Sequence, residues 1–237
     1  MFTLYSADFT GNPGNCSYPH KTVVMNTDNL REAVCHDYVC AEYKNHYRNG
    51  ENFISADCLP VDCDNDHSEE PKDCVTPADV LEAFPGVSIA IHYSRFNNRE
   101  KNGKPARPKF HVLFPIDRMT DATLYSDMKK LVNSIFPYFD TKALDAARFF
   151  FGTQEPNVEL YPGRMNLTEF LNDDEFDAGL PGGHKKDAVI PEGSRNAVMS
   201  RFAGIVIKKY GDSEKAYQSF LEKAATCVPP LDNNELS

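Results

Sequence analysis

The spacing of hydrophobic and polar positions over the first 170 residues predicts a mixture of strands and helices. Short apolar runs rich in β-branched or aromatic residues predict strands at residues 22–26, 53–64, 87–94, 109–115, 148–152 and 158–162. The run at 53–64 leads directly into an acidic cluster. A basic loop containing glycine and proline joins the runs at 87–94 and 109–115, which indicates a hairpin.

Apolar positions three and four residues apart predict helices between these strands. The helix expected over residues 27–45 begins with Thr27 as its N-cap and carries Leu30, Val34, Tyr38 and Ala41 on one face. A short helix is expected to start after Thr76, which can act as N-cap, with Pro77 at the first helical position. The helix expected over 121–136 has an apolar stripe made of Leu124, Met128, Leu131, Val132 and Ile135.

The C-terminal part has a different character. Residues 172–192 are rich in glycine, proline and charge without periodicity, which indicates a linker. Two helices, 194–211 and 213–227, are expected beyond it. We therefore predict an α+β domain at 1–171, a linker at 172–192 and a small all-α module at 193–237 that continues in a longer protein.

Bulk composition is that of a globular protein, with 237 residues, 25% charged and 41% hydrophobic. The sequence has neither an apolar run of the roughly 20 residues that span a bilayer nor a signal peptide, so we expect no membrane partner. Seven cysteines without a framework spacing indicate a reduced, cytoplasmic protein. Zinc binding stays open at two places, Cys35–His36–Cys40 and Cys58–Cys63, although neither has a C-x2-C spacing.

Charge is unevenly distributed within a net charge of −10. Residues 57–82 contain nine acids and one base, whereas residues 95–109 contain six bases and one acid. Neighbouring acidic and basic segments suit a site that holds metal ions and phosphates together. Two solvated loops are the alternative.

Asp62 and Asp64 lie at alternate positions at the end of the predicted strand 53–64. Alternation puts both carboxylates on one face, roughly 6–7 Å apart, where they can share hard divalent cations. An EF-hand is excluded because its glycine position is His67 and its bidentate glutamate position is Asp73. A D-x-D sugar-nucleotide transferase stays open. Asp66 starts a polar loop and is expected to turn away.

Two further segments carry charged residues that suit the same chemistry. Arg107, Lys109 and His111 share one face of the strand 109–115, where they can bind a polyphosphate or form a solvated surface. Asp140 follows the helix 121–136 and can complete a carboxylate trio. Arg148 can reach a phosphate, whereas we interpret the intervening Asp145 as a turn cap.

The motifs "DCDND" (62–66), "KFH" (109–111) and "FD" (139–140) resemble, in type and order, the three motifs of the archaeo-eukaryotic primase superfamily. Primase-polymerases of plasmids, phages and integrative elements are the nearest likeness, over residues 20–165. Lys109 departs from the pattern, because a small residue usually stands two positions before the histidine. The tail elements "GSRN" (193–196) and "PPLD" (229–232) resemble the helical primase C-terminal module.

This resemblance implies an RRM-like α+β catalytic core beside an N-terminal αβ unit, and template-directed nucleotidyl transfer by a DNA primase that can also act as a DNA polymerase. Two ions, Mg²⁺ or Mn²⁺, would be held by Asp62, Asp64 and Asp140. The nucleotide-binding residues it implies are Arg107, Lys109, His111 and Arg148, with Ser94 and Arg95 as further phosphate or template contacts. The implied partners are single-stranded DNA, nucleoside triphosphates and a replicative helicase.

A non-catalytic replication initiator that binds single-stranded DNA and recruits a helicase is the main alternative. The three aspartates count against it, because a pure binding protein gains nothing from repelling phosphates. A rolling-circle nicking enzyme would need an H-x-H metal pair, and the chain contains none.

Overall fold

The computed structural model describes residues 1–172 apart from 69, 101 and 102, together with residues 190–191, 199, 203, 213–225 and 227–228. The chain forms two compact units, Met1–Thr168 and Glu169–Ser237. All residues expected to form the site belong to the first unit. The boundaries 1–171, 172–192 and 193–237 stay a prediction, because most of the linker and of the first tail helix lies outside the described residues.

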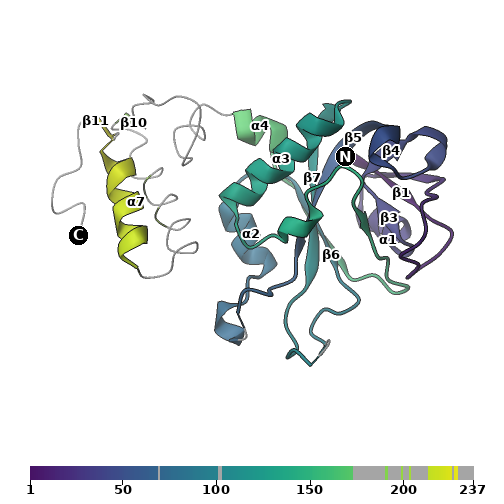
Figure 1. Cartoon of the computed structure of the whole chain (residues 1–237), viewed down its shortest axis with the longest axis horizontal. Coiled ribbons are helices and arrows are strands. Elements are labelled where there is room, and N and C mark those ends of the chain that lie inside the picture. Colours follow the sequence, from purple (N-terminus) through teal and green to yellow (C-terminus); the bar gives the residue numbers. More distant parts are fainter. Residues whose placement is uncertain are drawn as a thin grey trace. The chain divides into compact units, whose positions relative to one another are not determined.

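A five-stranded antiparallel sheet forms the centre of the first unit (Figure 1). In spatial order its strands are β4 (Ala41–Tyr43), β5 (Phe53–Cys63), β7 (Phe110–Met119), β6 (Ile89–Tyr93) and β9 (Val158–Tyr161). The register pairs Asp62 of β5 with His111 of β7, and His111 with His92 of β6. Three polar residues therefore stand side by side across the middle of the sheet.

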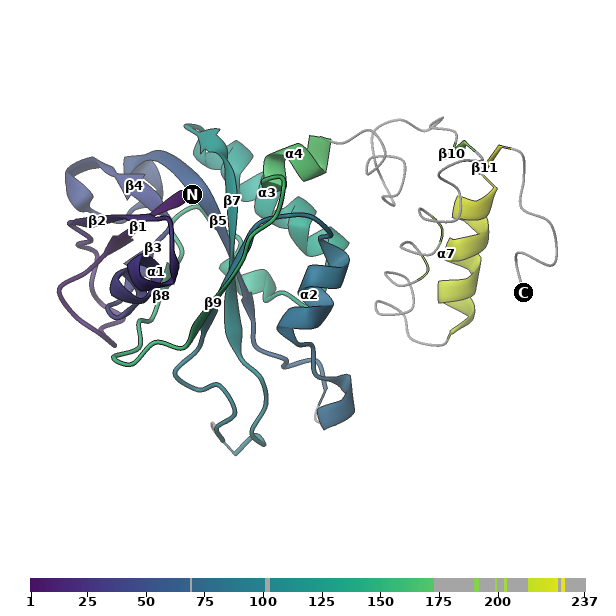
Figure 2. The same cartoon turned by 180° about the vertical axis from the view of Figure 1, so that it is seen from behind.

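Helices cover one face of this sheet (Figure 1, Figure 2). They are α2 (Pro77–Ala83), which starts at the predicted Thr76 capping box, and α3 (Ala122–Ile135). Phe114, pointing out of β7, meets Phe84 at the end of α2, and Phe84 in turn packs against Phe136 and Phe139 after α3. Burial of these four aromatic rings fixes the helices on the sheet.

A second sheet covers the opposite face, as Figure 2 shows from behind. Its strands, in spatial order, are β2 (His20–Val24), β1 (Phe2–Ser6), β3 (Tyr38–Val39) and β8 (Phe149–Phe150), and it packs with α1 (Thr27–Val34). Leu4, Tyr38 and Phe150 join Cys58 and Leu113 of the central sheet in one buried cluster. Side-chain alternation along β7 thus sends Leu113 and His111 towards this second sheet.

The helix expected over 27–45 is wrong in its length and its cap. It ends at Val34, and its N-cap is Asn26, whose side chain accepts a hydrogen bond from the Asn29 amide. Tyr38 pairs with Ser6 in β1 and with Phe150 in β8, so it belongs to a strand. Long-range strand pairing has overridden the local helical spacing.

The buried face of α3 also differs from the expected stripe. Tyr125, Lys129, Val132 and Ile135 are buried, whereas Leu124 and Leu131 are 59% and 39% exposed. The polar groups of Tyr125 and Lys129 can occupy the inner face of the helix because they find buried hydrogen-bond acceptors there. The Tyr125 hydroxyl donates to the Cys58 carbonyl (2.6 Å), and Lys129 Nζ donates to the Asp145 carbonyl (2.8 Å).

The chain from Leu167 to Asn172 forms α4, and the described remainder of the second unit contains α7 (Glu214–Ala224). Helix α7 covers most of the helix expected at 213–227, and Ser213 caps it. Two short strands, β10 (Ile190–Pro191) and β11 (Cys227–Val228), pair in parallel. Most of the expected helix 194–211, and the "PPLD" element, lie outside the described residues. Among the described helices, none is long and apolar enough to cross a membrane.

Candidate functional site

Three carboxylates converge at the end of β5. Asp62, Asp64 and Asp140 each offer an oxygen atom, and these atoms lie within 4.8 Å of one another. Asp62 is 7% exposed, and the other two are partly exposed. In the described part of the chain, this is the only group of three or more acidic, histidine or cysteine side chains close enough to share an ion, so neither cysteine set considered from the sequence forms such a group.

The turn after Asp64 separates Asp66 from this trio. Asn65 has a φ of 53°, in the left-handed region that asparagine tolerates better than most residues. Its side chain is buried and donates to the carbonyls of Val75 and Pro108 (both 2.8 Å) while accepting from the Val75 amide. The chain therefore reverses after Asp64, and the side chain of Asp66 is about half exposed.

A backbone hydrogen bond joins the two segments that carry the trio. The amide of Asp140 donates to the Asp62 carbonyl at 2.7 Å. The Asp140 side chain also caps a short 3-10 helix, Thr141–Ala143, by accepting from the Lys142 amide. The position of Asp140 is thus set by main-chain contacts at both ends of the turn.

Donors from three separate segments of the chain hold the next part of this loop. Lys129 donates to the carbonyl of residue 145, Tyr43 to that of residue 146 (2.7 Å) and Arg48 to that of residue 147 (3.0 Å). Asp145 accepts from the residue 147 amide, which is the turn-capping role expected from the sequence. Three consecutive carbonyls are therefore fixed immediately before Arg148.

The trio is electrostatically costly without a cation. Burial, with the neighbouring charges of Asp64 and Asp140, raises the pKa of Asp62 from 3.8 to about 7, although Arg148 and Lys109 act in the opposite direction. Carboxylate oxygens are the ligands that hard divalent cations prefer. A divalent cation would relieve this repulsion, so the three side chains fit such an ion in both chemistry and spacing.

Lys109 lies against the acidic turn. Its ammonium donates to both the carbonyl and the carboxylate of Asp64 at 2.8 Å and lies 3.5 Å from the carboxylate of Asp66. Asp66 also pairs with Lys104 and Arg107 at 3.5 and 3.6 Å. Partial burial would raise the pKa of Asp66, but Lys109 and Lys104 outweigh it and lower the pKa.

Arg107 and Arg148 both have unused donor capacity. Arg107 is buried and donates through Nη1 to the carbonyls of Asn65 (2.7 Å) and Ser68 (3.0 Å), while its Nη2 has no hydrogen-bond partner among the described residues. Arg148 places Nη2 3.9 Å from Asp62, and its buried Nε also has no hydrogen-bond partner there. Arg107 therefore braces the turn, whereas Arg148 faces the trio directly.

His111 stands beside Asp62 and contacts a buried polar network. Its Nε2 lies 3.6 Å from Asp62 Oδ1, and its Nδ1 lies 3.2 Å from the Tyr38 hydroxyl. Tyr38 also contacts His92 Nδ1 (3.1 Å), and His92 Nε2 contacts the Thr153 hydroxyl (3.2 Å). Burial lowers the pKa of His111 to about 3, against the opposing charge of Asp64, and lowers that of His92 as well.

Ser94 and Arg95 are placed differently from the other expected residues. Ser94 Oγ accepts from the Phe96 amide (3.4 Å), and the Arg95 guanidinium lies over the ring of Phe151 at 4.1 Å. Within the described residues, no hydrogen bond or ion pair joins either side chain to the three carboxylates. The structure thus groups Lys109, His111 and Arg148 with the trio, and leaves Ser94 and Arg95 apart from it.

Sequence reasoning missed the residues that organise this site. Asn65, Tyr38 and His92 had no role assigned, yet each is at most 1% exposed and bonds to a residue of the site or its turn. His92 carried a usable signal, because it is the polar residue of an otherwise apolar run that pairs with "KFH". Tyr38 gave no such signal in the sequence, because it fitted the apolar face of the expected helix.

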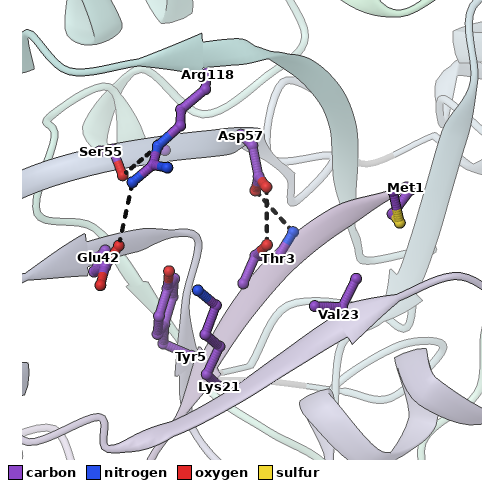
Figure 3. A pocket seen from close by; sticks show the side chains of 10 residues that line it. Met1, Thr3, Tyr5, Lys21, Val23, Glu42, Ser55, Asp57 and Arg118 are labelled. Carbon is purple, nitrogen blue, oxygen red and sulfur yellow. Dashed lines mark hydrogen bonds and ion pairs between the residues drawn. The ribbon is translucent and has the colours of Figure 1, made fainter.

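A separate pocket of about 310 Å³ lies between the two sheets of the first unit (Figure 3). Asp57 on its wall precedes Asp62 by five residues on β5, which is about 16 Å along a strand. Three of its charged side chains already pair with its own wall: Asp57 accepts from the Thr3 amide and hydroxyl (2.7 and 2.8 Å), and Arg118 lies 3.7 Å from Glu42. We assign no chemistry to this pocket.

The fold and site together define a mixed α/β protein in which three carboxylates converge beside a buried basic strand. No protein-family model and no curated protein matches the chain. Among solved structures, it is similar to the AEP domain of the primase-polymerase of cyanophage S-2L, with 12% sequence identity and a TM-score of 0.39 over 68% of this chain and 81% of that chain. At that level the similarity carries no argument, so the proposals below rest on this chain's own residues.

Proposed function

We propose that this protein is a template-directed nucleotidyltransferase, a DNA primase that can also extend primers, acting in replication of a mobile element. The observation that supports it best is the convergence of Asp62, Asp64 and Asp140 beside Lys109, His111 and Arg148. Carboxylates that gather a divalent cation, next to cationic and hydrogen-bond donors, suit the binding of a metal-bound triphosphate.

In this proposal the three aspartates hold two Mg²⁺ or Mn²⁺ ions. Bound ions would supply the charge stabilisation that the attacking 3′-hydroxyl and the pyrophosphate leaving group need. Lys109 now neutralises Asp64, and neutralisation of that carboxylate by a cation would free its ammonium for a phosphate. Arg148 and His111 face the same space with N–H donors, and Arg107 keeps the turn beneath them in place.

The finer assignments belong to the same proposal. Its partners are single-stranded DNA, nucleoside triphosphates and a replicative helicase, and the segment 193–237 acts as a helical module that assists initiation. Arg95 and Ser94 would contact the template or an outer phosphate, because they lie on the loop side of β6, apart from the carboxylates.

The decisive experiment compares Asp64→Asn with Asp66→Asn. These two acids occupy the same turn and both contact Lys109, but only Asp64 belongs to the trio. Protein, single-stranded DNA, labelled nucleotides and Mn²⁺ are incubated with and without a primer, and Mn²⁺ binding is measured separately by calorimetry. We expect Asp64→Asn to lose roughly 100-fold or more of incorporation and to weaken Mn²⁺ binding, whereas Asp66→Asn keeps most of both.

Near-normal incorporation by Asp64→Asn would refute the metal assignment. DNA binding by the unaltered protein without any incorporation would instead favour the replication initiator.

A further inference from the structure

The hydrogen-bonded network behind His111 contains more polar atoms than protons. This restricts which of its groups can donate and which must accept. Tyr38 is fully buried, and its hydroxyl lies between two ring nitrogens, Nδ1 of His92 at 3.1 Å and Nδ1 of His111 at 3.2 Å. The two Nδ1 atoms are themselves 3.4 Å apart. The hydroxyl has one proton, so it donates to one histidine and accepts from the other.

Both rings are buried, and at pH 8.5, about two units above the ordinary pKa of histidine, each is neutral. Two N–H groups cannot face each other across 3.4 Å, and two bare nitrogens there would leave the hydroxyl oxygen without a donor. Hence one Nδ1 atom carries a proton and the other accepts one. The Tyr38 hydroxyl therefore either accepts from His92 and donates to His111, or accepts from His111 and donates to His92.

The acidic trio decides between these directions. His111 Nε2 faces Asp62 Oδ1 at 3.6 Å, and Asp64 and Asp140 lie next to that carboxylate. A bare Nε2 would direct its lone pair at carboxylate oxygens, which are acceptors, whereas an Nε2 proton is attracted by them. With the proton on Nε2, His111 Nδ1 must accept from Tyr38, and Tyr38 must accept from His92 Nδ1.

We propose that Tyr38 and His92 are positioning residues that hold His111 as the neutral tautomer protonated on Nε2. The wiring then runs in one direction, from the Thr153 hydroxyl to His92 Nε2, from His92 Nδ1–H to Tyr38, and from the Tyr38 hydroxyl to His111 Nδ1. Phe150 packs against the rings of both Tyr38 and His111, which restricts their rotation.

The use of this donor rests on the proposed function. The Nε2–H of His111 would donate to a phosphate oxygen of the incoming nucleotide, at a site where the 3.6 Å separation from Asp62 is too long for a good hydrogen bond. A neutral donor binds a phosphate oxygen without adding a charge that would pair with the trio. The tautomer itself does not depend on that function.

The test is a long-range ¹H–¹⁵N correlation spectrum of the full chain labelled at its seven histidines, recorded at pH 8.5, where histidine is ordinarily neutral. Signals are assigned by their disappearance in His92→Gln and His111→Gln. We expect the Nε2–H tautomer for His111 and the Nδ1–H tautomer for His92. The Nδ1–H tautomer at His111, or a rapid average of the two forms, would overturn the proposal.

Tyr38→Phe gives the second measurement, with Tyr18→Phe as its matched control. Tyr18 is also a buried tyrosine, and its hydroxyl contacts a backbone carbonyl far from both histidines in sequence. In Tyr38→Phe we expect a mixture of tautomers at His111 and a KM for nucleotide raised about three- to tenfold, the effect of one neutral hydrogen bond. Tyr18→Phe should change neither.

An unchanged His111 tautomer in a folded Tyr38→Phe protein would contradict the role of Tyr38. If Tyr38→Phe does not fold, the spectrum of the unaltered chain still decides the wiring. Absence of all nucleotide incorporation would refute the proposed function and leave the tautomer result standing.

Discussion

Replacing Asp62 by asparagine should stabilise the metal-free protein at neutral and alkaline pH, even though it removes a residue of the proposed active site. The folded protein binds a proton at Asp62 more tightly than the unfolded chain does, because its pKa rises from 3.8 to about 7. Between these two values the native state therefore holds more protons than the unfolded state. Stability from this group is fully present below pH 3.8 and is lost as the pH rises through about 7.

The size of the effect follows from the same pKa values. One pKa unit corresponds to about 1.4 kcal/mol, so the ionised carboxylate destabilises the fold by about 4 kcal/mol at pH 8 and by less than about 2 kcal/mol at pH 5. An asparagine side chain at this position would carry no charge at either pH. The stability difference between Asp62→Asn and the unaltered protein should therefore grow steadily between pH 5 and pH 8.

Urea unfolding followed by circular dichroism, with EDTA present, measures this difference. The matched control is Asp66→Asn, which should lose some stability at pH 8, because the pKa of Asp66 is lowered and its charge helps the fold. Added Mn²⁺ should stabilise the unaltered protein and not Asp62→Asn. If Asp62→Asn is no more stable than the unaltered protein at pH 8 in EDTA, the ionised Asp62 carboxylate does not destabilise the folded state, and the reasoning is wrong.

Two further predictions concern the loops around the site. Gly152→Ala should destabilise the first unit by about 3 kcal/mol, because a Cβ at this position would lie 2.2 Å from the His36 carbonyl oxygen, and thermal unfolding checks it. Changing Arg99, Lys101 and Lys104 together to alanine should flatten the salt dependence of single-stranded DNA binding, by about one unit of slope for each DNA phosphate that these side chains neutralise. An unchanged slope would mean that this basic loop does not touch DNA.

The parts of the fold that depend only on local sequence patterns could be predicted. Strand β5, the capping box of α2 and the two faces of β7 all follow from alternation or capping residues within a few positions. Strand β1 was not expected, because both of its faces are buried and its short sequence mixes apolar residues with Thr3 and Ser6. Helix α1 was drawn too long, because the pairing of Tyr38 with two distant strands cannot be seen in local spacing.

The site residues also fall into two groups, those that local spacing predicts and those that long-range contacts bring together. Alternation along one strand was enough to place Asp62 and Asp64 together. The position of Asp140 depends on a hydrogen bond to a residue 78 positions earlier, so only its motif suggested it. Strand register places His92 beside His111, and Thr153 reaches His92 from a loop after β8; the second relation cannot be seen in the spacing of the residues.

The loop from Asp140 to Arg148 is shaped through its main chain. Its carbonyls at 145, 146 and 147 and its amide at 140 make hydrogen bonds, and the donors Lys129, Tyr43 and Arg48 lie in other segments of the chain. Asp140, Asp145 and Arg148 use their side chains, and Ala143 is fully buried, but the other positions of the loop can be exchanged while its outline stays constant. Distant homologues should therefore vary at the remaining positions of this loop and keep the donors outside it. Laboratory selection could therefore vary Thr141 and Lys142, which are exposed next to Asp140, with the scaffold left untouched.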